Sequence, residues 1–155
     1  MLRATLLALS LALSAPQVLA EAFEDAFDDA VSAYDRGDFD TAAKTLRKLA
    51  EQGYARGQNG LGVMYQYGLG VPKDYEEAVF WYRLAADQGN ATAQFLLGYM
   101  YDKGQGVPKN YSEAERWFRL AADQGHASAQ FNLGVMHEVG HGVLQDYAEA
   151  VKLYR

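Results

Sequence analysis

The 155-residue chain holds 14 Lys and Arg against 20 Asp and Glu, so its formal net charge at pH 7 is −6. This acidic balance argues against a surface that binds nucleic acid or an anionic membrane. The sequence contains no Cys, which excludes a disulfide framework and a zinc site built from thiolates.

The N-terminus carries the pattern of an export signal. Arg3 supplies a positive charge, residues 4–13 are apolar, and Val18-Leu19-Ala20 fits the small-residue rule for cleavage. The apolar run is shorter than the ~20 residues that span a bilayer. We therefore expect residues 1–20 to be removed after Ala20, which leaves a mature chain without membrane contact. The alternative is an uncleaved membrane anchor.

Residues 21–53 predict a first helical hairpin. Apolar residues recur at helical spacing on both sides of a turn at residues 35–38. They are Phe23, Phe27, Ala30 and Tyr34 before the turn, and Phe39, Ala42, Ala43, Leu46 and Leu49 after it. The acidic side of residues 23–29 suits the polar outer face of a terminal capping unit.

From Tyr54 onward the sequence repeats itself. Residues 54–89 and 90–125 are identical at 22 of 36 positions without a gap, and a third copy occupies residues 126–155. A fixed period in this range indicates stacked units, each of which is too small to bury its apolar face alone.

Each unit predicts a helix, a Gly-rich loop and a second helix. Leu61, Met64 and Tyr65 share one face of the first helix. Asp74 is the predicted N-cap of the second, and Glu77 follows at the spacing of a capping box. The same pair recurs as Asn110 with Glu113 and as Asp146 with Glu149.

The second helix has an apolar stripe and an aromatic periodicity. The stripe consists of Ala78, Trp81, Tyr82 and Ala85, and Gly89 stands where a helix end favours positive φ. Aromatic residues that recur at the repeat period are predicted to belong to the core, namely Tyr75, Tyr111, Tyr147, Trp81 and Trp117. The Gly-x-Gly of each loop is interpreted as a turn, because no strand precedes it.

The 36-residue units resemble Sel-one-like repeats, a branch of the tetratricopeptide superfamily. The matching motifs are Ala-x-x-Gln-x-x-Leu-Gly-x-Met-Tyr at 55–65, Gly-x-Gly-Val-Pro-Lys-Asp-Tyr at 68–75, and Glu-Ala-x-x-Trp-Tyr-Arg-Leu-Ala-Ala-Asp-Gln-Gly at 77–89. Residues 33–42 resemble a tetratricopeptide repeat at its turn. The resemblance implies an all-α fold, a right-handed α-solenoid of antiparallel helix pairs. It also implies a role as an adaptor or regulator that binds another protein or peptide, often in the bacterial periplasm.

Positions that differ among the three units are the candidates for a partner-binding groove. They fall on one stripe of the first helix, and in tetratricopeptide-like folds this stripe lines the concave face. The residues are Arg56, Asn59, Val63, Gln66 and Tyr67; Thr92, Phe95, Tyr99, Asp102 and Lys103; and Ser128, Phe131, Val135, Glu138 and Val139. Aromatic residues would form the centre of the groove, and Arg56, Asp102, Lys103 and Glu138 would set the register of the partner. The alternative is that Phe95 and Phe131 pack in the core.

The histidines raise the question of a metal site. His137 and His141 are spaced i, i+4, which on one helix would allow a shared metal. Gly140 and Gly142 flank His141 and place it in the loop, while His137 stands where the other units have Tyr. We therefore expect no metal and no other cofactor.

No nucleophile elbow or isolated carboxylate pair indicates catalysis, so we expect a protein that is not an enzyme. Cysteine-rich relatives in the superfamily are linked to β-lactam hydrolysis, and this resemblance leaves a hydrolase of cell-wall or β-lactam substrates as the alternative. This chain lacks the cysteines of that type.

The third unit departs from the pattern. Leu144 replaces Pro72 and Pro108, Leu153 replaces Trp81 and Trp117, and His137 replaces Tyr65 and Tyr101. The sequence ends at Arg155, inside the predicted second helix and before the position of its Gly cap, so we expect exposed apolar surface at this end. Either the sequence is a fragment, or purely structural, or another chain covers this end, as in self-association.

Overall fold

The computed structural model describes residues 15–155, which fold into eight α-helices with no strand among them. The helices are α1 (Ala15–Asp35), α2 (Phe39–Glu51), α3 (Ala55–Tyr67), α4 (Tyr75–Asp87), α5 (Ala91–Lys103), α6 (Tyr111–Asp123), α7 (Ala127–Val139) and α8 (Tyr147–Leu153). Residues 1–14 of the predicted signal peptide, which spans residues 1–20, lie outside the described residues.

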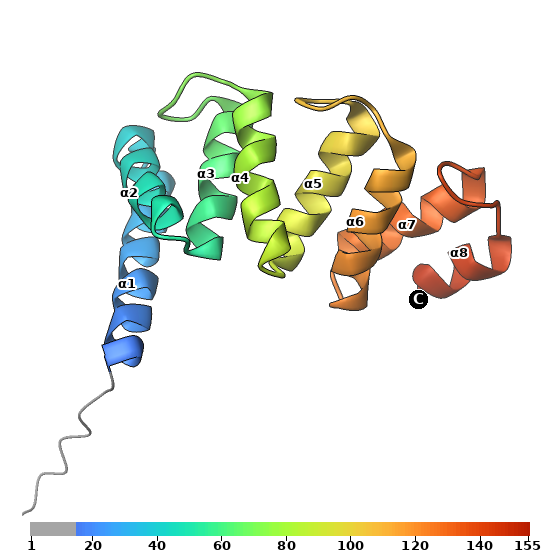
Figure 1. Cartoon of the computed structure of the whole chain (residues 1–155), viewed down its shortest axis with the longest axis horizontal. Coiled ribbons are helices and arrows are strands. Elements are labelled where there is room, and N and C mark those ends of the chain that lie inside the picture. Colours follow the sequence, from blue (N-terminus) through green and yellow to red (C-terminus); the bar gives the residue numbers. More distant parts are fainter. Residues whose placement is uncertain (1–14) are drawn as a thin grey trace, which may run out of the picture.

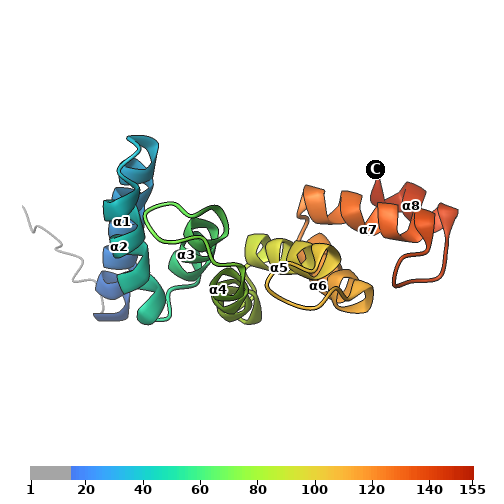
Figure 2. The same cartoon turned by 90° about the horizontal axis from the view of Figure 1, so that it is seen from above.

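The helices stack in chain order as antiparallel pairs. Each helix packs against its neighbours in the sequence, from α1 at one end of an elongated row to α8 at the other (Figure 1). Seen from above, the row bends along its length (Figure 2). The prediction of an all-α repeat solenoid is therefore confirmed.

The core runs through the stack as three clusters, one between each pair of adjoining units. Leu61 and Met64 of α3 are buried against the α1–α2 hairpin, as the predicted helix face requires. Alanines fill much of the rest of the core, which lets the helices approach closely. Trp117, Tyr82 and Phe118 are the largest fully buried side chains.

Tyr34 of the predicted apolar stripe and Tyr147 of the predicted core are both exposed. Tyr34 is 41% exposed and packs only the edge of its ring on Phe39. Tyr147 is 63% exposed, although its counterparts Tyr75 and Tyr111 are half-buried. Both rings therefore lie at the surface of the stack.

The predicted N-caps form, but the reciprocal half of the capping box does not. The carboxylate of Asp74 accepts hydrogen bonds from the backbone N–H groups of Glu76 and Glu77 at 2.9 and 3.1 Å. The N–H of Asp74, which a capping box would give to the glutamate, donates instead to the carbonyl of Tyr65 at 3.0 Å. Asn110 and Asp146 repeat this bond with Tyr101 and His137. The bond closes each long loop back onto its own first helix.

The Gly-rich loop of each unit rests on the second helix of the unit before it. A Cβ added at Gly106 would collide with the backbone carbonyl of Tyr75, the first residue of α4. Gly106 also has φ +68°, which L residues rarely adopt. Gly70 and Gly142 contact Phe39 and Tyr111 in the same way. The glycines thus set the contact between successive units, beyond making a turn.

Helix α1 runs without interruption through the predicted cleavage point after Ala20. Its residues 16–20 are exposed, and its packing on α2 uses residues from Phe27 onward. None of the helices formed by residues 15–155 is both long enough and apolar enough to cross a membrane.

Candidate functional site

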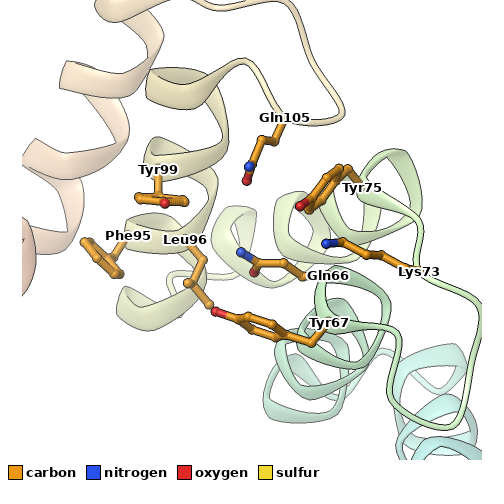
Figure 3. A pocket seen from close by; sticks show the side chains of 8 residues that line it. All are labelled: Gln66, Tyr67, Lys73, Tyr75, Phe95, Leu96, Tyr99 and Gln105. Carbon is orange, nitrogen blue, oxygen red and sulfur yellow. The ribbon is translucent and has the colours of Figure 1, made fainter.

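A pocket of about 300 Å³ lies between the α3–α4 hairpin and α5. Its lining consists of Gln66, Tyr67, Lys73, Tyr75, Phe95, Leu96, Tyr99 and Gln105. Figure 3 shows these side chains around the cavity, with Phe95, Leu96 and Tyr99 projecting from α5 on one side and Lys73 and Tyr75 on the other. We call this cavity the first pocket.

A second pocket of about 210 Å³ lies one unit further along, between the α5–α6 hairpin and α7. Its lining consists of Asp102, Lys103, Lys109, Tyr111, Phe118, Asn132, Val135, Met136, Val139 and His141. Adding 36 to seven of the eight lining positions of the first pocket gives lining positions of the second. The pocket is therefore a property of the repeat, and its side chains change from unit to unit.

Eight of the fifteen predicted groove residues line these pockets. Gln66, Tyr67, Phe95 and Tyr99 line the first, and Asp102, Lys103, Val135 and Val139 line the second. The remaining seven, Arg56, Asn59, Val63, Thr92, Ser128, Phe131 and Glu138, line neither. The predicted stripe and the pockets thus overlap mainly in the last turns of the first helices. A binding role for these residues stays a prediction.

Arg56 is engaged by the N-terminal unit. Its guanidinium forms an ion pair with Glu24 of α1 and lies 4.1 Å above the ring of Phe27. The hydroxyl of Tyr54 donates to the same carboxylate at 2.6 Å. Arg56 therefore joins α1 to the start of α3.

The variable position at the end of the first helix pairs with an aromatic residue of the second. The Tyr82 hydroxyl donates to the Gln66 side chain at 2.5 Å, and the Tyr154 hydroxyl donates to the Glu138 carboxylate at 2.8 Å. In the middle unit the aromatic residue is Phe118, which has no hydroxyl. Its partner position, Asp102, pairs with Lys103 at 2.6 Å instead.

The variation at 66, 102 and 138 therefore follows intramolecular pairing at least in part. Gln66, which the pattern placed in the open groove, is buried and 6% exposed. Burial also raises the pKa of its partner Tyr82 well above 10.0, because an ionised phenolate cannot be solvated in the core. Asp102 in turn raises the pKa of Lys103 by accepting a hydrogen bond from the charged amine.

The two predicted phenylalanines differ in their surroundings. Phe95 is half-buried between the rings of Phe118 and His126, at centroid distances of 5.8 and 4.8 Å, and it still lines the first pocket. Phe131 is 59% exposed and contacts only the ring of Tyr154 among the aromatic residues described. Phe95 therefore packs partly against the core and partly forms the wall of the first pocket.

Sequence reasoning missed the residues that the loop and the second helix contribute. The ammonium group of Lys73 lies 4.7 Å from the centre of the Tyr75 ring, and Lys109 lies 4.7 Å from that of Tyr111. The signal is present in the sequence as Val-Pro-Lys-x-Tyr in the first two units. The pattern alone predicts a turn followed by a core aromatic residue, because the Lys and the Tyr are the same in both units and therefore do not mark a variable position.

The two histidines considered as metal ligands, His137 and His141, face different partners. His141 stacks on Tyr111 with ring centres 4.6 Å apart, while the ring of His137 lies 3.5 Å from the Arg119 guanidinium. In the part of the chain that the structure describes, no group of three or more His, Asp or Glu side chains is placed to hold a metal ion.

The model of the Sel1 repeat family matches residues 55–90, 91–126 and 127–155. The structure is similar to a Sel1 repeat protein from Oxalobacter formigenes, with 40% identity and a TM-score of 0.79 over 83% of this chain and 53% of that one. It is also similar to a protective antigen of uropathogenic Escherichia coli strains that displays an SLR fold, with 37% identity and a TM-score of 0.81 over 92% of this chain and 32% of that one.

The chain thus spans 53% and 32% of the lengths of these two relatives. Cysteine rich protein B of Helicobacter pylori shares the fold, with 24% identity and a TM-score of 0.56 over 70% of this chain and 92% of that one. No curated protein matches the sequence.

Proposed function

Because this chain belongs to the Sel1 repeat family, whose members are in general non-enzymatic interaction scaffolds, we propose that it binds a protein or peptide along the face that carries the two pockets. The observation that carries the proposal is the recurrence of one pocket at the repeat period. Two equivalent cavities on one face can accept two side chains of a single extended partner.

The composition of the first pocket supports this proposal. Tyr67 is 61% exposed, and Tyr99 and Phe95 are half-buried beside it. Aromatic side chains supply large contact areas at a low cost in conformational entropy, which is why they dominate the residues that anchor interfaces. Rigid helices position all three rings before a partner arrives, so little further ordering is needed.

Capture of a partner from the organism that carries the gene tests this proposal. The tagged chain is compared with Tyr67→Ala/Tyr99→Ala and with the control Phe80→Ala, which removes an exposed aromatic residue of α4 outside both pockets. We expect a partner that the wild type and the control retain and the double variant loses, with helicity unchanged by circular dichroism. A partner kept by the double variant would contradict the proposal.

We further propose that the protein acts as an adaptor outside the cytoplasm, after removal of residues 1–20. The sequence pattern supports this, because Arg3, the apolar run at residues 4–13 and the small residues before the cleavage point follow the rule for a removable export signal. Osmotic-shock fractionation followed by N-terminal sequencing should give a mature chain that starts at Glu21. Recombinant residues 21–155 should also melt at the temperature of the full chain, and a clear drop would show that residues 1–20 belong to the fold.

A further inference from the structure

We infer that the pockets select a partner segment in which a carboxylate stands beside an apolar or aromatic side chain, with Lys73 and Lys109 as the residues that contact the carboxylates. This inference rests on the proposed function, since it names the chemistry of the segment bound at the same face. It follows from the placement, the charge and the surroundings of the two lysines.

Both lysines are held in the same way by the backbone of their loops. A Cβ added at Gly68 would lie 3.0 Å from Cβ of Lys73, and one added at Gly104 would lie 3.1 Å from Cβ of Lys109. The loop thus abuts the stem of each lysine, while its ammonium group lies over the ring of the tyrosine two positions on. The position of each lysine side chain is therefore set by contacts that recur in both units.

Neither lysine has its charge compensated within the fold. No carboxylate of the described residues lies within ion-pair distance of Lys73 or Lys109. The other predicted cations of this face are paired, Lys103 with Asp102 and Arg56 with Glu24. In a chain of net charge −6, two unpaired cations at equivalent positions of two pockets mark where a negative group is attracted.

The other residues that line the first pocket indicate which partner side chain stands beside the carboxylate. The first pocket contains no Asp or Glu, and besides Lys73 its lining includes Tyr67, Leu96 and Tyr99. An apolar or aromatic side chain fits these surfaces, and burying it shields the ion pair from water, which strengthens the attraction. The second pocket keeps its lysine but exchanges Leu96 for Asn132 and Tyr99 for Val135. We therefore expect the stronger aromatic preference at the first pocket.

The third unit supplies a natural neutral version of the lysine position. Gln145 stands at the position of Lys73 and Lys109, and its amide donates to the Tyr147 hydroxyl at 2.7 Å. Glutamine is thus accommodated at this place in the loop. Lys73→Gln/Lys109→Gln should fold normally while removing both charges, and Lys44→Gln, an exposed lysine of α2 outside both pockets, removes a charge elsewhere.

The test is selection of a phage-displayed library of random linear peptides on the full chain, on Lys73→Gln/Lys109→Gln and on Lys44→Gln. We expect the wild type and Lys44→Gln to enrich Asp or Glu next to Phe, Tyr, Trp or Leu, and the double variant to lose the acidic preference. For the most enriched synthetic peptide, replacing its acidic residues with Gln should weaken binding to the wild type about tenfold in fluorescence anisotropy, with little effect on the double variant.

Three results would overturn the inference. Peptides enriched without an acidic preference, or an acidic preference that survives in Lys73→Gln/Lys109→Gln, would overturn it and leave the proposed function standing. The absence of any enriched peptide would overturn it as well, and the capture experiment described above would then decide the proposed function separately. Thermal unfolding followed by circular dichroism checks that all three proteins are equally folded.

Discussion

At the scale of single residues, a substitution between units can keep a contact to an unchanged arginine. Arg47 of α2 donates to the Tyr65 hydroxyl of α3 at 2.8 Å, and Arg83 of α4 makes the same bond to Tyr101 of α5. In the third unit His137 takes the place of the tyrosine, and its Nε2 faces the Arg119 guanidinium. The histidine that the sequence raised as a metal ligand therefore occupies a structural position between neighbouring units.

Tyr82 offers a residue-scale prediction with a pH signature. Its buried hydroxyl bonds Gln66, and its raised pKa means that the neutral phenol stabilises the fold fully below the unfolded pKa near 10.0. This stabilisation is lost as the pH rises above that value, because the unfolded chain then releases a proton that the folded chain retains. We expect Tyr82→Phe to cost about 1 kcal/mol at pH 7 and to flatten the decline of stability above pH 10.

Urea unfolding at a series of pH values measures both effects. The control is Tyr67→Phe, because Tyr67 is exposed and its hydroxyl is not buried in the core. Phe118 occupies the equivalent position in the middle unit, so the ring alone fits the site. An alkaline decline as steep in Tyr82→Phe as in the wild type would contradict the assignment.

At the scale of elements, contacts between residues that are far apart in the sequence join the units. The loop of one unit rests on the first residue of the second helix of the unit before it, 31 positions earlier for Gly106 and Tyr75 (106 − 75 = 31). Glutamine side chains form a further link, because the amides of Gln58 and Gln94 donate to the carbonyls of Ala50 and Ala86 in the preceding unit at 3.2 and 3.1 Å. Gln88 donates to Gln58 and Gln124 donates to Gln94, both at 2.7 Å.

A pair of glycine substitutions isolates the contact between loop and helix. Gly106 and Gly125 both have positive φ, +68° and +82°, so replacing either with Ala costs about 1–2 kcal/mol of backbone strain. An added Cβ meets open space at Gly125 but collides with backbone at Gly106. We expect Gly106→Ala to destabilise the protein by clearly more than Gly125→Ala in urea unfolding. Equal losses would mean that the loop can lift off α4 without cost.

Much of the fold could be predicted from the sequence, because the signals that form each helix lie within the sequence of its own unit. Apolar spacing located Leu61 and Met64 on a buried face, and Asp74 was recognised as an N-cap from its position after the Gly-rich loop. Such signals are local, so one unit suffices to detect them. Their repetition at a fixed period then gave the stack.

The candidate site could be predicted only in part, because its walls come from separate units. Tyr99 was found because it varies on the first helix, but Lys73 and Tyr75 enter the first pocket from a loop and from the next helix. The engagement of Arg56 by Glu24 depends on how α1 folds back, which no repeat pattern encodes. The hydrogen bond between Gln66 and Tyr82 likewise depends on how α3 packs against α4, so the sequence pattern alone does not predict it.

At the scale of the whole molecule, each helix packs only on its chain neighbours, so stability varies along the stack. The helices α3 to α6 have a packed unit on both sides, whereas nothing among residues 15–155 covers the outer side of α8. Leu144 is 90% exposed there, and α8 has only seven residues. Opening of this end therefore exposes little additional apolar surface and costs little free energy.

Hydrogen exchange measured by mass spectrometry tests this gradient. We expect backbone amides of α4 and α5 to exchange most slowly, and those of α7 and α8 to exchange fastest among the helices of residues 39–155. The reason is that α7 and α8 can separate from α6 without breaking the two inner clusters of the core. Uniform protection across the helices would show that the chain opens as one cooperative block.

The joint between Gly106 and the start of α4 has an evolutionary consequence. Gly70 and Gly142 make the same joint with their own predecessors, so every module offers the next one an identical docking edge. An in-frame duplication of 36 codons would then add a module without redesign of either boundary, and it would bring its own pocket with it. If the proposed function holds, the length of the bound partner segment would grow with the number of repeats in the chain, by one side-chain pocket for each repeat.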